Sequence, residues 1–171
     1  MTNYICAIDQ GTTGTKALIL DEELTVHAHV LRAFDPVYPN PSWVEQDPES
    51  IWYTTLEAIA EARQQAGIDE AEIDAVGITN QRETTVLWDR ETGDPVYNAI
   101  VWQDRRTADR VQQLADEGHE ETIREKTGLL LDPYFSASKL EWILENVSGV
   151  RERAEQGRLA SGTVDSFLLW R

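Results

Sequence analysis

The stretch 4–20 constrains the fold most, because two short apolar runs flank a polar turn that contains two glycines. The runs 5–8 and 17–20 are typical of buried strands, so the stretch predicts a β-hairpin. In its turn, Gly11 and Gly14 are expected to adopt the positive φ of a tight reversal and to leave the backbone open to a ligand. A hairpin with an accessible turn is therefore expected to begin the domain.

The turn of this hairpin has the residues needed to hold a phosphate. Backbone N–H groups and the hydroxyls of Thr12, Thr13 and Thr15 can converge on one anion, and Lys16 adds a positive charge. Asp9, at the end of the first strand, is a candidate for Mg²⁺, bound directly or through water. A turn that binds nothing is the alternative. The P-loop is excluded, because a strand rather than a helix follows.

The 171 residues carry a net charge of −16, from 31 acidic and 15 basic side chains. This balance argues against nucleic acids and anionic membranes as partners. We interpret the acidic surface as that of a protein from a high-salt, halophilic cytoplasm, where salt screens the self-repulsion. An ordinary acidic soluble protein is the alternative. The length predicts one domain.

The sequence has one cysteine, Cys6, which excludes an intramolecular disulfide and is expected in the core. No stretch has the pattern of a signal peptide, and none is long and apolar enough to cross a membrane. We therefore expect a cytoplasmic protein.

Further strands and helices follow from the patterning of the remaining chain. A third antiparallel strand is expected over 26–31, with His27 and His29 on an exposed face rather than in a metal site. The proline-rich stretch 34–47 should be irregular but packed. Asp47 and Pro48 predict the start of a helix that ends at Gly67 and buries a stripe of Ile51, Trp52, Thr55, Leu56, Ile59 and Ala62. Strands are then expected over 73–79, 84–88 and 99–102, and helices from 103, over 120–126 and over 136–146.

Arg82 and Glu83 are adjacent on the polar connection between two of the expected strands. Arginine donates hydrogen bonds and glutamate accepts them, so the pair could orient the hydroxyls of a small polyol. An exposed charge pair without a ligand is the alternative.

Several segments resemble the FGGY family of carbohydrate kinases. Residues 9–16, DQGTTGTK, resemble the first phosphate-binding motif of the actin, Hsp70 and sugar-kinase superfamily. Residues 77–85, GITNQRETT, resemble the polyol-binding segment of the family members that phosphorylate glycerol. Residues 134–146, YFSASKLEWILEN, resemble the first family signature at every constrained position, and residues 162–171 resemble the family as well.

The resemblance implies an α/β protein with the ribonuclease H-like fold of that superfamily, whose mixed sheet opens with a three-strand antiparallel meander. It implies ATP-dependent phosphorylation of glycerol to sn-glycerol 3-phosphate, with Mg²⁺, by a cytoplasmic homo-oligomer. Residues 1–171 are then expected to be an incomplete N-terminal kinase domain. The second domain, the adenine pocket and the catalytic base would lie elsewhere, and this chain alone would be inactive.

The resemblance also implies roles for individual residues. The phosphates of ATP would be held by Thr12, Thr13, Gly14 and Lys16. Glycerol would be held by Arg82, Glu83, Tyr134 and Trp102, although a plain core tryptophan is the alternative at position 102. Asp9 would organise Mg²⁺. Close relatives often have Ser in place of Gly14 and Arg in place of Lys16, and a lysine lacks the bidentate fork of an arginine.

Three other functions stay open at this point. Another FGGY kinase would keep the turn and the Tyr134 signature but change Arg82 and Glu83. A ribonuclease H-type nuclease needs clustered carboxylates and a surface that tolerates nucleic acid, which the charge of −16 disfavours. A non-catalytic binding module is the third.

Overall fold

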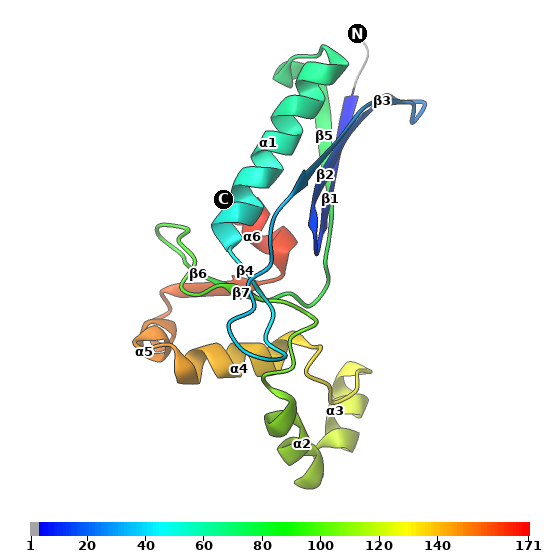
Figure 1. Ribbon diagram of the computed structural model, residues 1–171. Helices are drawn as coiled ribbons and strands as arrows, with labels where there is room; N and C mark the ends of the chain where they lie inside the picture. Colours follow the sequence, from blue (N-terminus) through cyan, green and yellow to red (C-terminus); the bar gives the residue numbers. More distant parts are fainter. Residues whose placement is uncertain (1–3) are drawn as a thin grey trace.

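The computed structural model describes residues 4–171 and contains a four-stranded sheet with helix α1 along one of its faces (Figure 1). Helices α2 and α3 lie together at the far end of the molecule, beyond the end of the sheet. The elements are, in chain order, β1 (Tyr4–Gly11), β2 (Gly14–Leu20), β3 (Val26–Ala33), β4 (Glu45–Gln46), α1 (Pro48–Ala66), the 3₁₀ turn η1 (Glu70–Glu72), β5 (Ile73–Asn80), β6 (Val86–Asp89), β7 (Ala99–Ile100), α2 (Ala108–Asp116), α3 (Glu120–Thr127), α4 (Ser136–Asn146), α5 (Val150–Glu155), β8 (Leu159–Gly162) and α6 (Val164–Trp170).

The main sheet has the strand order β3-β2-β1-β5. The first three strands form an antiparallel meander, and β5 returns parallel to β1 after the crossover through α1. This confirms the predicted mixed sheet and its opening meander. The consequence for function is that β1 and β5 end at the same edge, where the residues that follow them lie close together.

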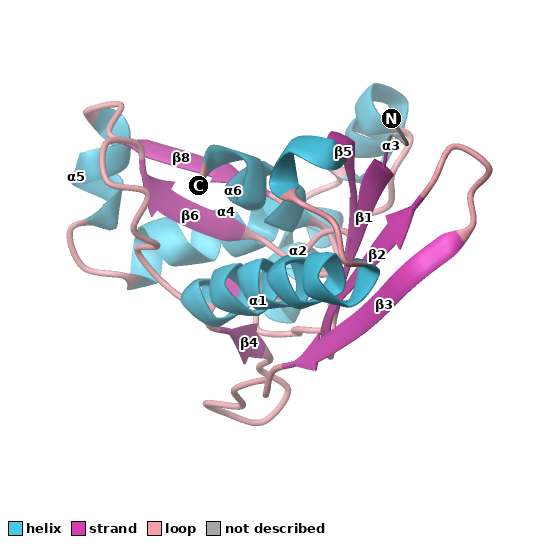
Figure 2. Cartoon of the chain, turned by 90° about the horizontal axis from the view of Figure 1, so that it is seen from above, coloured by secondary structure: helices cyan, strands magenta, loops and turns pink. Residues whose placement is uncertain are grey.

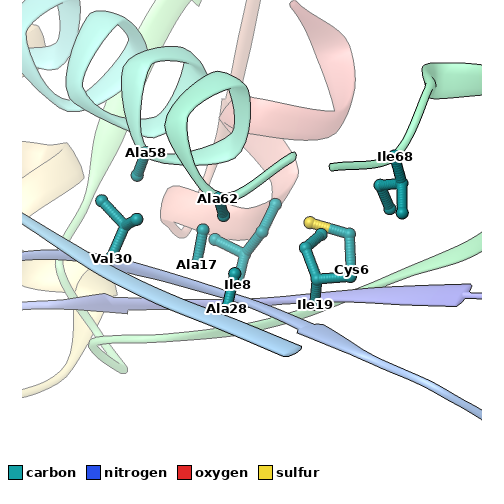
Figure 3. Close-up of a cluster of buried hydrophobic side chains, with 9 residues drawn as sticks. All are labelled: Cys6, Ile8, Ala17, Ile19, Ala28, Val30, Ala58, Ala62 and Ile68. Carbon is teal, nitrogen blue, oxygen red and sulfur yellow. The ribbon is translucent and has the colours of Figure 1, made fainter. Parts of the chain in front are cut away.

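Helix α1 begins and ends where its capping residues predict. The Asp47 carboxylate accepts the backbone N–H of Glu49 at 3.0 Å, and Gly67 ends the helix with a φ of +68°. Small residues of α1, Ala58 and Ala62, face the sheet and allow a close approach (Figure 3). Around them Figure 3 shows a cluster of Cys6, Ile8, Ala17, Ile19, Ala28, Val30 and Ile68, all buried. Cys6 is thus a core residue, as predicted.

The second half of the chain builds a smaller layer beside the main sheet. Strands β6 and β8 pair antiparallel, and α6 lies against them (Figure 2). Phe167 of α6 meets Trp88 of β6, with ring centroids 5.6 Å apart. The short pair β4 and β7 joins the proline-rich segment to this half. Within residues 4–171, no helix is both long enough and apolar enough to span a membrane.

The proline-rich segment is irregular but packed, as predicted. The buried guanidinium of Arg106 contacts two indole rings. Its Cζ lies 4.0 Å from the ring centroid of Trp43, in the proline-rich segment, and 4.5 Å from that of Trp142 on α4. Arg106 also donates to Glu45 and Asp104, both at 2.8 Å. Because a buried charge needs such partners, this cluster fixes the segment against α4.

Four expectations about secondary structure and packing are wrong. Leu56 is 42% exposed, because the buried stripe of α1 runs through Ile51, Thr55, Ala58 and Ala62 instead. The strand expected over 84–88 begins only at Val86 and pairs with β8, outside the main sheet. The strand expected over 99–102 ends at Ile100. The helix expected from 103 begins at Ala108, because the Asp104 carboxylate accepts the backbone N–H of Arg106 at 2.8 Å and makes a turn there.

Candidate functional site

The turn between β1 and β2 reverses the chain through Thr12 and Thr13, with Gly11 opposite Gly14. Neither glycine has a positive φ, so the expectation of that backbone conformation is wrong. Gly14 instead allows β3 to lie close to β2, because with β3 in this position a Cβ at residue 14 would be 2.5 Å from the carbonyl oxygen of Arg32. The hairpin therefore turns with ordinary backbone angles at two threonines.

Asp9 and Lys16 lie opposite each other on β1 and β2, just before and just after the turn. Lys16 Nζ is 3.2 Å from Asp9 Oδ2, and both side chains are about half exposed, at 47% and 44%. The pair thus forms an accessible dipole of one cation and one carboxylate. The hydroxyl of Thr15 faces inward to that of Thr55 on α1 at 3.4 Å, so Thr15 does not line the outside of the turn.

The segment that follows β5 lies beside this turn. In the parallel register Gln10 is opposite Asn80, and the backbone N–H of Gln81 donates to the carbonyl of Gln10 at 2.8 Å. Arg82 comes next and is exposed. Glu83 has a φ of +65°, which is rare for a residue with a side chain.

Glu83 is held from both ends by the start of α4. Its carboxylate accepts the backbone N–H of Ser136 at 2.9 Å and the Ser136 hydroxyl at 2.7 Å. Its carbonyl accepts from Lys139 Nζ at 3.1 Å, and Lys139 also donates to the carbonyl of Tyr134. These bonds explain how the unusual backbone angle at Glu83 is maintained.

Lys139 is fully buried at the centre of this arrangement. Burial lowers the pKa of its ammonium group to about 8, although the negative charges of Glu83, Asp104 and Asp132 oppose the change. At neutral pH Lys139 is therefore still protonated and ties the segment before α4 to the loop that follows β5.

An open pocket of about 320 Å³ lies at this edge and is lined by Asn80, Gln81, Arg82, Trp102 and Tyr134. The rings of Trp102 and Tyr134 meet edge to face, with centroids 5.9 Å apart. Trp102 Nε1 donates to the Thr12 hydroxyl at 3.0 Å, which joins the pocket to the turn. The pocket is at the small end of ligand-binding cavities and suits a molecule of a few carbon atoms.

The structure brings most of the expected site residues to one place. Arg82, Trp102 and Tyr134 line the pocket, and Thr12 bonds to its wall. Glu83 does not line it, because its carboxylate is bonded to the first residue of α4. The sequence interpretation missed Gln81, which lines the pocket, and Gln10, Gln46 and Lys139, which are buried polar residues behind it. Their type and burial are the only signals, and burial is not visible in the sequence.

Comparisons with known proteins identify the relatives of this chain. The N-terminal domain of the FGGY family of carbohydrate kinases matches residues 4–171. A glycerol kinase from Marinomonas sp. is 57% identical over 171 residues, which is 100% of this chain and 35% of the relative. A glycerol kinase from Paraburkholderia xenovorans is 57% identical over 98% of this chain and 34% of the relative. The chain thus spans about a third of the length of these curated relatives.

Solved structures match the fold closely. The Plasmodium falciparum glycerol kinase with ADP has a TM-score of 0.91 at 33% identity, over 99% of this chain and 34% of that one. A xylulose kinase from Rhodospirillum rubrum has a TM-score of 0.81 at 26% identity, over 98% of this chain and 33% of that one. The match to sugar kinases confirms the predicted ribonuclease H-like fold.

Proposed function

The chain belongs to the FGGY family of carbohydrate kinases, and we propose that the complete protein transfers the γ-phosphoryl group of ATP to glycerol, giving sn-glycerol 3-phosphate. The observation that carries the proposal is the hydrogen bond from Trp102 to Thr12, which puts the pocket wall in contact with the turn. Phosphoryl transfer requires an acceptor hydroxyl next to the terminal phosphate, and two adjoining subsites supply that geometry. The identity of 57% to proteins named glycerol kinase supports glycerol as the acceptor.

The turn is the phosphate subsite in this proposal. Thr12, Thr13 and Gly14 offer backbone N–H groups and hydroxyls, and Lys16 offers an exposed cation. Asp9 is a single, half-exposed carboxylate, which fits Mg²⁺ because this ion keeps several waters and shares its coordination with phosphate. When bound there, Mg²⁺ neutralises charge on the phosphate oxygens. With Asp9 engaged by the ion, the Lys16 ammonium would be available to contact the phosphates.

The pocket is the glycerol subsite. Arg82 donates to glycerol hydroxyls, Tyr134 offers its phenol, and the ring of Trp102 covers the carbon atoms. Glu83 follows Arg82 directly but is not part of the pocket lining; its Oε2 stays on Ser136, and we assign its other carboxylate oxygen to a glycerol hydroxyl. A hydroxyl placed between the two side chains accepts a hydrogen bond from the arginine and donates one to the glutamate.

The base that accepts the glycerol proton is assigned to the part of the protein outside residues 1–171. Among the described residues, the pocket lining contains no carboxylate, and the neighbouring Glu83 carboxylate already accepts the N–H and the hydroxyl of Ser136, so it is not free to take up a proton from glycerol. We therefore treat 1–171 as the N-terminal kinase domain, inactive by itself. We further propose that the complete enzyme is a homo-oligomer that works in the cytoplasm, where ATP is available.

A substrate panel tests the proposal. The complete protein is assayed with Mg·ATP on glycerol, xylitol, xylulose and gluconate at matched concentrations. We expect kcat/KM for glycerol to exceed the other values by at least about 100-fold, since a site built for specific hydroxyls rejects misfitting ones strongly. A higher value for another polyol would keep the kinase assignment and overturn the substrate.

A further inference from the structure

Three glutamines meet in the interior behind the turn, and one of them, Gln81, also lines the pocket. Gln10 comes from β1, Gln46 from β4, and Gln81 from the loop after β5, and their exposures are 0%, 0% and 7%. Buried amides carry a cost unless their donors and acceptors are used. The bonds that they make therefore identify what the cluster does.

Gln81 is the centre of the cluster. Its Nε2 donates to Oε1 of Gln10 at 3.0 Å and to Oε1 of Gln46 at 2.7 Å. Its Oε1 accepts the hydroxyl of Thr84 at 2.8 Å. Both amide hydrogens of Gln81 are thus used, and no other residue type of this size offers two donors and an acceptor in one plane.

The other two glutamines hold the carbonyls of the turn. Gln10 Nε2 donates to the carbonyl of Gly11 at 2.9 Å, and Gln46 Nε2 donates to the carbonyl of Thr12 at 2.7 Å. In a planar trans peptide, the next N–H points away from the carbonyl. Binding these two carbonyls inward therefore turns the N–H groups of Thr12 and Thr13 away from the glutamines, so that they can serve an anion.

A second set of hydrogen bonds connects Gln81 to the turn by way of the pocket wall. Thr84 Oγ1 accepts the backbone N–H of Trp102 at 3.3 Å, and Trp102 Nε1 donates to the Thr12 hydroxyl at 3.0 Å. The bonds run from Thr12 through Gln46, Gln81, Thr84 and Trp102 back to Thr12. The turn at Thr12 and Thr13 and the pocket wall at Trp102 are consequently held in one relative position.

We propose that Gln81 is a positioning residue, which fixes the turn at Thr12 and Thr13 relative to the pocket wall at Trp102. Gln46 connects Gln81 to the turn. The inference rests on the proposed function for its substrates. Gln46 acts on nucleotide binding alone, because within residues 4–171 its side chain makes hydrogen bonds only to Thr12 and Gln81. Gln81 acts on both substrates, because it bonds to both sides.

The test uses Gln46→Met and Gln81→Met in the complete protein, since methionine has a similar size and shape without the amide. We expect Gln46→Met to raise KM for ATP about tenfold, equivalent to about 1.4 kcal/mol, and to leave KM for glycerol within about twofold. Gln81→Met should raise both values about tenfold. The matched control is Gln65→Met on the exposed side of α1, which should change neither.

Two outcomes would overturn the inference. One is a pair of folded variants whose two KM values stay within about twofold of wild type. The other is an equal loss in kcat with no difference between the substrates, which marks a merely structural cluster. If Gln81→Met does not fold, Thr84→Val decides, because it removes only the hydroxyl that joins Gln81 to Trp102 and should raise KM for glycerol.

The proposed function can fail separately. If the wild-type protein does not phosphorylate glycerol, the substrate assignment is wrong, and calorimetric binding of Mg·ADP still tests the role of Gln46. A dissociation constant about tenfold higher in Gln46→Met than in wild type would support the positioning role. Equal constants would refute it.

Discussion

The indole N–H of Trp102 donates to the hydroxyl of Thr12 at 3.0 Å, across 90 positions of sequence. The same indole ring meets Tyr134 at 5.9 Å between centroids. The turn at Thr12, the pocket wall and the segment that begins at Tyr134 therefore converge on one side chain. Changes at Trp102 should reveal how far the two proposed subsites depend on each other.

Replacing Trp102 by Phe keeps an aromatic ring beside Tyr134 but removes the donor to Thr12. We expect KM for ATP to rise about 3- to 10-fold, because one hydrogen bond contributes about 1 kcal/mol, and KM for glycerol to change less. Steady-state kinetics of the complete protein measure both. The control is Trp88→Phe, since the Trp88 N–H has no hydrogen-bond partner within residues 4–171. An unchanged KM for ATP in Trp102→Phe would contradict the link between subsites.

A methyl group at Gly14 has no room. Its Cβ would lie 2.5 Å from the carbonyl oxygen of Arg32 and 3.0 Å from Cα of Ala33, both backbone atoms. Gly14→Ala should therefore destabilise the protein by about 1–3 kcal/mol, seen as a lower Tm in calorimetry. Gly77→Ala is the matched control, because a Cβ there meets nothing within 4 Å. Equal Tm values for the two variants would mean that β3 can move away.

Lys139 gives the protein a specific dependence of stability on pH. Its pKa is about 8 in the folded state against an ordinary 10.5, so between these values the unfolded chain binds more protons. The contribution of Lys139 to the free energy of unfolding therefore rises with pH across this window, by up to about 1.4 kcal/mol per pH unit. Denaturant titrations of wild type and Lys139→Met from pH 7.5 to 10.5 measure it.

The difference between these two proteins in free energy of unfolding should change with pH, in favour of wild type as pH rises. Lys126→Met, at an exposed lysine of α3, serves as the control and should run parallel to wild type. Parallel profiles for Lys139→Met would show that Lys139 does not lose its proton in this window.

The net charge of −16 predicts that salt stabilises the protein. Raising KCl from 0.1 M to 1 M shortens the Debye length from about 10 Å to about 3 Å and weakens repulsion between surface carboxylates. We expect Tm to increase with KCl, and to increase less in a variant with Glu22→Gln and Glu23→Gln in the exposed β2–β3 turn. A Tm that stays constant or falls would argue against a high-salt origin.

Local signals predicted the elements that depend on them. Asp47, Pro48 and Gly67 marked α1, and the signature segment predicted α4 over Ser136–Asn146 as observed. Strand β8 and helix α5 were not predicted. Leu159–Gly162 lacks an alternating pattern and becomes a strand only by pairing with β6, about 70 residues earlier. Such pairing is a tertiary effect that overrides local propensity.

The candidate site divides in the same way. Arg82, Trp102 and Tyr134 were predicted by resemblance and do line one pocket. The cluster of glutamines was not predicted, because Gln81 bonds to Gln10 and Gln46, which are 71 and 35 residues away in the sequence. A glutamine in a polar stretch carries no sign of burial until the fold is known.

The most direct test of the central claim compares wild type with Arg82→Ala in ATP-dependent phosphorylation of glycerol by the complete protein. Wild type should turn over glycerol, and Arg82→Ala should lower kcat/KM about 10- to 100-fold, because a hydrogen bond to a charged group contributes about 1.5–3 kcal/mol. Arg124→Ala, at an exposed arginine of α3, should match wild type. Failure of wild type to use glycerol, or an Arg82→Ala variant as active as wild type, would contradict the account.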